Sequence, residues 1–252
     1  MALLSGMGQH ASAGFLSNYS GNSQFQFDGA ATSDGIVNFA VYHNPGGGDW
    51  TDDFGLPAGT IQQLFEPSGS GQSVGNGLDT TAEYVYFYQI VNTDPNTSDE
   101  SELKSLELFL PGTTSMITSA GYLDDYVFDD GGPTGPTGNA RLGTFTDTTA
   151  ADDVPGDATP SESGAVPSGS GFVAHGSAVE PDNADEIGSS TIEFNFTAQV
   201  PIPPGGFSSV FFLTSFGAPI YHPELLEDGD NTHADIPIPN PEPSSVAMTL
   251  GV

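Results

Sequence analysis

Short segments of this chain alternate apolar and polar residues with a period of two, and this pattern restricts the possible folds more than any other feature. Across 191–198, Ile192, Phe194 and Phe196 alternate with polar residues, which predicts a strand with one buried face and one wet face. Segment 82–91 is apolar or aromatic on both faces, which predicts a central strand. Since no long segment has the period of an amphipathic helix, the chain is expected to be all-β.

Glycine, proline and the aromatic residues agree with this expectation. The chain has 252 residues, of which 33 are Gly and 20 are Pro, and both types interrupt helices and favour turns. Its 17 Phe and 8 Tyr supply enough apolar surface to fill a core. We therefore expect an antiparallel two-sheet β-sandwich, of jelly-roll or immunoglobulin-like topology. The alternation does not distinguish between these two topologies.

The links between the patterned segments suggest which strands pair. We expect three antiparallel pairs, namely 23–29 with 35–43, 82–91 with 103–110, and 191–198 with 207–216. The third pair is joined by the proline-rich segment 201–206. Further strand candidates are 122–128, 141–146 and 171–175.

One domain is expected to hold all of these strands. Residues 14–235 form this sandwich, with an insertion at 129–170 whose Gly, Pro, Thr, Ser and Asp content is typical of a long loop. A linker between two domains is the alternative, but the strands after it are too few to close a core alone. Residues 1–13 look like the end of a truncated signal peptide, because 11–13 read Ala-Ser-Ala, the small-x-small pattern of a cleavage site.

The charge of the chain excludes several classes of partner. There are 33 acidic residues against two basic ones, Lys104 and Arg141, which gives a formal net charge of −31. Such a chain repels phosphate backbones, so nucleic-acid binding and nucleotide chemistry are not expected. The absence of Cys excludes disulfides and thiolate sites. An anionic surface attracts cations, Ca²⁺ among them, and cationic matrix components, but most of the acids are interpreted as keeping the protein soluble in salty water.

Calcium is the one cofactor that the residues suggest. Glu227, Asp228 and Asp230 lie together in segment 227–231 and offer the oxygen ligands that hard cations prefer. The segment lacks the spacing and the closing Glu of an EF-hand loop. The acidic pairs at 124–125 and 129–130, which flank a strand candidate, are further places where a cation could bind.

Catalytic motifs are not convincing, and the chain is expected not to be an enzyme. Residues 71–75 match the G-x-S-x-G nucleophile elbow, but Asn76-Gly77 follows and blocks the helix that the elbow requires. The five His are scattered without a metal-binding spacing.

A loop with the only Trp is a candidate for ligand contact. Trp50, Asp52 and Asp53 lie in the run 49–53, where an aromatic ring beside carboxylates could meet a sugar or a cation. A Trp that caps the edge of the core is the alternative interpretation.

Near the end of the chain stand Pro241, Glu242, Pro243 and Ser244, followed by a short apolar run. This segment resembles the start of a PEP-CTERM sorting signal, in which Pro-Glu-Pro precedes a transmembrane helix and an Arg-rich cluster. Segments 83–95, 103–112 and 208–223 are similar to those of planctomycete-type surface proteins of this group. Only nine residues follow Pro243, whereas a transmembrane helix needs about 20, so residues 236–252 are interpreted as a truncated signal.

The resemblance implies an exported bacterial protein of the cell surface or extracellular matrix, sorted by an exosortase-type protease. A structural or adhesive role is expected, with extracellular polysaccharide as a candidate partner. A carbohydrate-binding module is the alternative, and it predicts an exposed cluster of aromatic side chains. A secreted hydrolase is less favoured, and it predicts a Ser or a carboxylate pair in a deep pocket.

Overall fold

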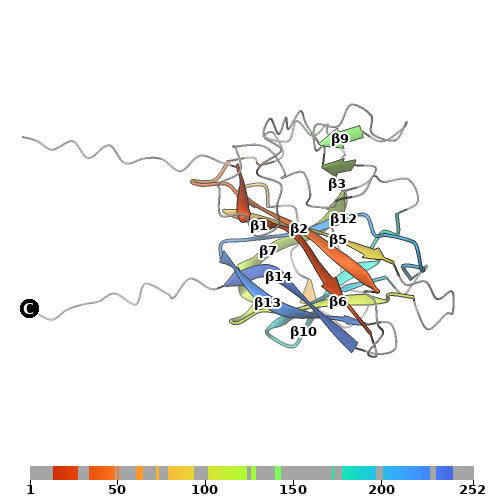
Figure 1. Cartoon of the computed structure of the whole chain (residues 1–252). Helices are drawn as coiled ribbons and strands as arrows, with labels where there is room; N and C mark the ends of the chain where they lie inside the picture. Colours follow the sequence, from red (N-terminus) through yellow and green to blue (C-terminus); the bar gives the residue numbers. More distant parts are fainter. Residues whose placement is uncertain are drawn as a thin grey trace, which may run out of the picture.

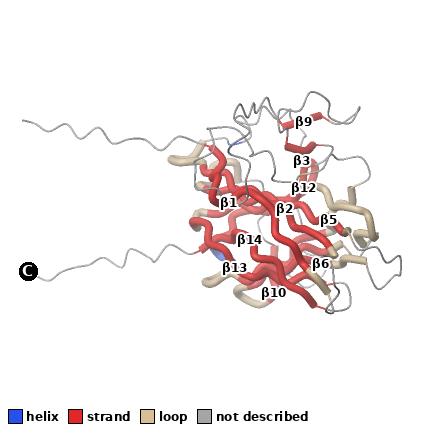
Figure 2. Tube along the Cα trace, in the orientation of Figure 1, coloured by secondary structure: helices blue, strands red, loops and turns tan. Residues whose placement is uncertain are grey.

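Two antiparallel sheets packed face to face make up most of the part of the chain that the structure describes (Figures 1 and 2). The computed structural model describes residues 14–27, 34–48, 50, 61–64, 72–73, 79–93, 102–123, 126–128, 140–142, 172, 178–196, 201–227 and 231–240. The expected all-β sandwich is confirmed. Within these residues, no helix is long and apolar enough to cross a membrane.

The first sheet has the strand order β1-β2-β5-β12-β7-β3. Its strands are β1 (Gly14–Phe25), β2 (Gly35–His43), β5 (Tyr84–Asn92), β12 (Val210–Ser215), β7 (Ile117–Leu123) and β3 (Ile61–Leu64). The second sheet has the order β14-β13-β6-β11-β10-β4. Its strands are β14 (Asn231–Asn240), β13 (Ala218–Glu227), β6 (Ser105–Phe109), β11 (Thr191–Asn195), β10 (Asn183–Ile187) and β4 (Gln72–Ser73). A short parallel pair, β8 (Tyr126–Phe128) with β9 (Ala140–Leu142), and a 3₁₀ turn, η2 (Thr114–Met116), complete the described elements.

Strand β5 lies in the middle of the first sheet, between β2 and β12, as its two apolar faces predict. On one face Tyr86, Tyr88 and Ile90 enter the core between the sheets. On the other face Phe87 meets the rings of Trp50 and Phe212 at centroid distances of 6.1 and 6.2 Å. The first sheet is therefore covered on both faces, which explains why β5 shows no polar face.

The main core is formed by side chains that alternate inward from both sheets. Phe194 of β11 and Phe211 of β12 meet across the gap, with ring centroids 4.6 Å apart. Tyr88 reaches across as well, and its hydroxyl donates to the carbonyl oxygen of Pro237 at 2.8 Å. These contacts bury large apolar surfaces, the main favourable term in folding, and satisfy the polar end of the tyrosine.

Two of the three expected strand pairs are wrong. The pair 23–29 with 35–43 is confirmed, since β1 and β2 form a hairpin that sets Phe25 opposite Gly35. Strands β5 and β6 lie in different sheets, and so do β11 and β12. Alternation reports that a face is buried but does not specify the neighbouring strand. The turn at Gly205, where φ is +77°, is tied to the end of β5 rather than closing a hairpin, because the Gly205 N–H donates to the carbonyl oxygen of Asn92.

A proline-containing hairpin, β13 with β14, ends the sandwich. The two strands pair over their full length, from Ala218 opposite Asn240 to Glu227 opposite Asn231. Ile236 and Ile238 are fully buried in the core. The expected domain boundary at residue 235 is therefore wrong, because it cuts through β14. Proline is tolerated in β14 because this strand has a partner on one side only.

One side of the sandwich is closed by a side chain that links the two sheets. Thr232 of β14 uses its Oγ1 to donate to the carbonyl oxygen of Gln26 at 2.6 Å, and the same oxygen accepts the Gln26 N–H at 3.3 Å. The hydroxyl thus satisfies both backbone groups of Gln26, directly after edge strand β1. The expected signal-peptide remnant at 1–13, most of the insertion 129–170 and all of the strand candidate 171–175 except residue 172 lie outside the described residues.

Candidate functional site

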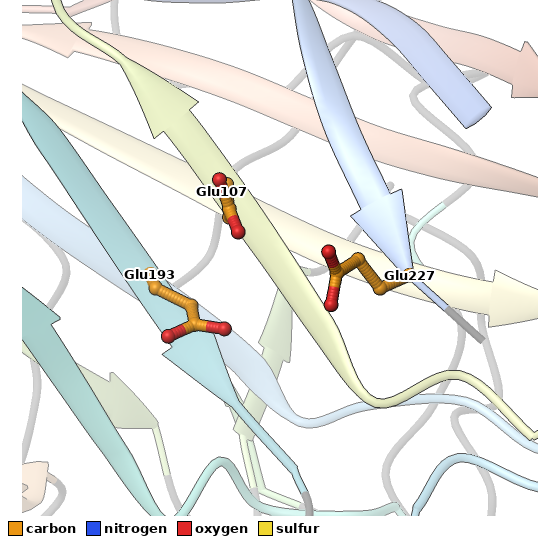
Figure 3. Close-up of side chains that lie close together, drawn as sticks. All are labelled: Glu107, Glu193 and Glu227. Atoms are coloured by element: carbon orange, nitrogen blue, oxygen red, sulfur yellow. The ribbon is translucent and has the colours of Figure 1, made fainter. Parts of the chain in front are cut away.

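Three glutamates gather on the outer face of the second sheet (Figure 3). They are Glu107 of β6, Glu193 of β11 and Glu227 of β13. Each offers one carboxylate oxygen, and these oxygens all lie within 4.8 Å of one another. We call this group the acid triad. Oxygens at such spacing could together hold a divalent cation.

Strand register explains why these three residues meet. Glu193 stands directly opposite Glu107 in the β11–β6 ladder, and Glu227 stands opposite Ser105, two residues before Glu107. In each of the three strands the neighbouring apolar residue, namely Leu106, Phe194 or Leu226, faces the core. Side chains of a strand alternate between faces, so the glutamates must point outward on three adjacent strands.

The acid triad concentrates negative charge on a partly buried surface. Burial raises the pKa of Glu107, and the charges of Glu193 and Glu227 raise it further. Like charges directly opposite each other on adjacent strands destabilise a sheet. The arrangement is therefore unfavourable by itself, and a bound cation would offset the repulsion.

Asp185 of β10 extends the negative charge by one more strand. It stands opposite Glu193 in the β10–β11 ladder. Burial raises its pKa, and the charge of Glu193 raises it further. Its Oδ1 is buried and has no hydrogen-bond partner among the described residues. Carboxylates thus stand on four consecutive strands of the second sheet, in the order Asp185, Glu193, Glu107 and Glu227. We call these four residues the acidic row.

The structure brings only one of the three expected calcium ligands into a group of acids, and its partners there are different residues. Of the three, Glu227 joins the acid triad, while Asp228 and Asp230 lie outside the described residues. Glu107 and Glu193 were not among the residues predicted from the sequence. Each is a lone glutamate on the polar face of an apolar strand, and such a residue gives no signal until the register of β6, β11 and β13 is known.

The expected ligand contact through Trp50 is wrong. Its side chain is fully buried, and its Nε1–H donates to the carbonyl oxygen of Asp79 at 3.0 Å. The indole packs edge-on against Phe212 at a centroid distance of 5.6 Å. The alternative interpretation, a Trp at the edge of a core, describes it well. Asp52 and Asp53 lie outside the described residues.

An exposed aromatic residue stands elsewhere, on β13. Tyr221 is 46% exposed, its ring stacks on Tyr19 with centroids 5.3 Å apart, and it meets Phe39 edge-on at 5.8 Å. Its hydroxyl donates to the carbonyl oxygen of Asn18 at 2.7 Å. Hydrogen bond and stacking hold the ring in place, so it presents a fixed apolar surface to solvent.

The residues of the catalytic motif and the histidines occupy ordinary structural positions where the structure describes them. Ser73 lies in β4 and stands opposite Asp185 in the ladder with β10, whereas a nucleophile elbow places its Ser at a strand-to-helix turn. His43 stacks on Tyr84 with centroids 4.8 Å apart. His222 lies 2.8 Å, Nδ1 to Oε1, from the buried carboxyl of Glu224.

Comparison with protein-family models, with curated proteins and with solved structures finds no match to this chain. Any account of its function therefore depends on its residues and their arrangement. The motif at Pro241, Glu242, Pro243 and Ser244 lies outside the described residues.

Proposed function

We propose that this chain is a non-enzymatic module of an exported bacterial protein of the cell surface or extracellular matrix, with a structural or adhesive role. The observation that carries the proposal is the acidic row, which sets four carboxylates side by side across one sheet face. Charges built into paired strands keep their spacing, unlike charges on flexible loops. Such a face suits binding to cationic or cation-bridged polymers of a matrix.

The acidic row is also unfavourable for folding, and this supports a functional interpretation. Glu107 and Asp185 both have a raised pKa because of burial and of neighbouring acids. Natural proteins keep local features that oppose stability mainly where function requires them. Solubility alone would be served equally well by acids spread over the surface.

For export we propose that Pro241, Glu242, Pro243 and Ser244 act as an address for an exosortase-type sorting protease. Two points support this. The segment resembles the start of a PEP-CTERM signal, and its first residue directly follows Asn240, the last residue of β14. A sorting motif placed directly after the last strand can be processed without cutting the sandwich.

Fractionation of the source bacterium tests this proposal. The full-length protein and a variant with Pro241, Glu242 and Pro243 replaced by Ala are expressed at equal levels and followed with an antibody. We expect the wild-type protein in the surface and matrix fractions and the variant inside the cell envelope. If the wild-type protein stays in the cytosol, the proposal of export is wrong. If both proteins are distributed equally, the Pro-Glu-Pro motif is not the sorting address.

A carbohydrate-binding module is a second candidate, and Tyr221 is the observation that favours it. Its ring is exposed, stacked on Tyr19 and fixed by a hydrogen bond, and flat fixed rings of this kind stack on sugars. A glycan array tests it, with Tyr221→Ala as the variant and Phe216→Ala as the control. Phe216 is a comparably exposed ring at 52%. Binding that is lost only with Tyr221→Ala would support this candidate.

A further inference from the structure

We propose that Glu107, Glu193, Glu227 and Ser105 form a calcium-binding site on the outer face of the second sheet (Figure 3). The proposal goes beyond the structural or adhesive role and does not depend on export. It concerns one ion at a defined position rather than a diffuse cloud of counterions around an acidic protein.

The spacing of the three carboxylates fits one calcium ion. Ca²⁺ binds oxygen at about 2.3–2.6 Å, so two ligands on opposite sides of the ion lie about 4.8 Å apart. The three carboxylate oxygens of the acid triad lie within 4.8 Å of one another. All three can therefore reach a single ion without any change in the backbone.

Ser105 provides an independent indication that something binds here. The residue is only 2% exposed, and its Oγ has no hydrogen-bond partner among the residues that the structure describes. In strand β6 it lies on the same face as Glu107, and it stands opposite both Glu227 and Asn195. A buried hydroxyl without a partner costs about 1–3 kcal/mol. An ion held by the acid triad would give this oxygen a partner.

The surroundings of the site hold the ligands in position. Asn195 of β11 donates from Nδ2 to Glu193 Oε2 at 3.1 Å, which orients that carboxylate. The backbone N–H of Lys104 donates to the carbonyl oxygen of Glu227 at 2.8 Å, which ties β13 to the chain directly before β6. Such outer contacts are typical of sites in which the ligands are oriented before the ion arrives.

The chemistry of the ligands selects Ca²⁺ over other ions. The proposed donors are three carboxylates and one hydroxyl, which are hard oxygen ligands that suit Ca²⁺ and Mg²⁺ rather than Zn²⁺ or Cu²⁺. Mg²⁺ requires nearly ideal octahedral geometry and loses its water reluctantly. A triad on a partly exposed sheet face is better matched by the larger and more tolerant Ca²⁺.

Isothermal titration calorimetry of the full chain with CaCl₂, at constant ionic strength, tests the proposal. The variant is Glu107→Gln combined with Glu193→Gln. The control is Glu83→Gln, which removes an acid that lies 3.7 Å from His43 beside the other sheet. We expect the tightest calcium site of the wild-type protein to weaken on the order of tenfold or more in the double variant. The control should bind as the wild type does, and Mg²⁺ should bind more weakly than Ca²⁺.

Ser105→Ala separates a built site from simple attraction between charges. It leaves the net charge unchanged, so a diffuse counterion effect predicts no change, whereas the proposed site predicts a several-fold increase in Kd. Thermal unfolding without calcium checks that each variant folds. The proposal is overturned if the wild-type protein binds no calcium, or if the folded double variant binds it as tightly as the wild type.

Discussion

The carboxyl group of Glu224 accepts the backbone N–H of Phe109 at the point where strands β6 and β13 separate. The ladder between these strands ends at Leu225, which stands opposite Glu107. Pro223 directly precedes Glu224 in β13 and has no backbone N–H to donate. The fully buried Glu224 side chain thus replaces a backbone acceptor, and this is why an acidic residue can occupy the core.

Burial makes Glu224 a source of pH dependence. It raises the pKa of this carboxyl from 4.5 to about 9, although the bond from Phe109 acts in the opposite direction. Between these pH values the folded protein keeps a proton that the unfolded chain releases, so stability falls as pH rises. The stability that the protonated Glu224 contributes is fully present below pH 4.5 and is lost as pH rises toward 9. Among the described residues, Tyr88 and His222 are titratable groups that face the carboxyl.

Glu224→Gln should therefore reduce this pH dependence, because the amide keeps an acceptor oxygen and cannot ionise. From about pH 5 to pH 8 we expect the free energy of unfolding of the variant to fall less steeply than that of the wild type. The difference between the two slopes should be about 1.4 kcal/mol per pH unit. Denaturant unfolding at several pH values measures the slope. Glu83→Gln serves as the control and should follow the wild type. Parallel curves for Glu224→Gln and the wild type would show that Glu224 titrates normally.

Glu107→Gln should stabilise the protein when divalent cations are removed. The change takes away one of three facing negative charges, and like charges on opposed residues of a sheet cost about 0.2–1 kcal/mol. We expect Tm in EDTA to rise by roughly 1–3 °C. The raised pKa of Glu107 means that the same gain should shrink as pH falls and the carboxyl is protonated. A lower Tm in EDTA would show that Glu107 makes a favourable contact instead.

Trp50 should report a buried environment in solution. It is the only Trp of the chain, so its fluorescence can be assigned without mutation. We expect blue-shifted emission and weak quenching by iodide, both of which change on unfolding in guanidinium. Trp50→Ala should cost about 3–5 kcal/mol, the usual range for a large core side chain. An emission maximum equal to that of the unfolded chain would contradict its burial.

Gly35 should not tolerate a side chain. A Cβ there would overlap Cζ of Phe25 and lie 2.5 Å from the carbonyl oxygen of Val91, so both β1 and β5 would have to shift. We expect Gly35→Ala to destabilise the protein by about 1–3 kcal/mol or more. Gly46→Ala is an informative comparison, because no atom lies within 4 Å of its added Cβ and only its φ of +86° opposes the change. Equal unfolding midpoints for Gly35→Ala and the wild type would refute the clash.

Alternation of residue types was enough to predict the fold class and the central position of β5. It was not enough to predict which strands pair, because Leu106 and Leu108 would be buried equally well in either sheet. The hairpin of β13 and β14 was not predicted, because it contains Pro219, Pro223, Pro237 and Pro239. Proline argues against a strand unless the register and the position at a sheet edge are known.

The acid triad shows the same limit at the level of the site. Glu107, Glu193 and Glu227 are far apart in the sequence, and only the pairing of β6 with both β11 and β13 brings them together. The sequence therefore predicts an acidic surface but not the place where acids converge. For Trp50 the difficulty was different, because its acidic neighbours in sequence suggested solvent, whereas its ring lies against Phe87 and Phe212.

The bond between Thr232 and Gln26 also bears on self-association. An uncovered strand edge is a template onto which a second copy can add, and this risk grows with protein concentration. On one side of the sandwich, Thr232 occupies the backbone groups of Gln26 where the edge strands β1 and β14 approach each other. The remaining edge strands, β3 and β4, are four and two residues long, and short edges are poor templates. The strand edges of the two sheets therefore resist edge-to-edge addition of further copies and the growth of fibres.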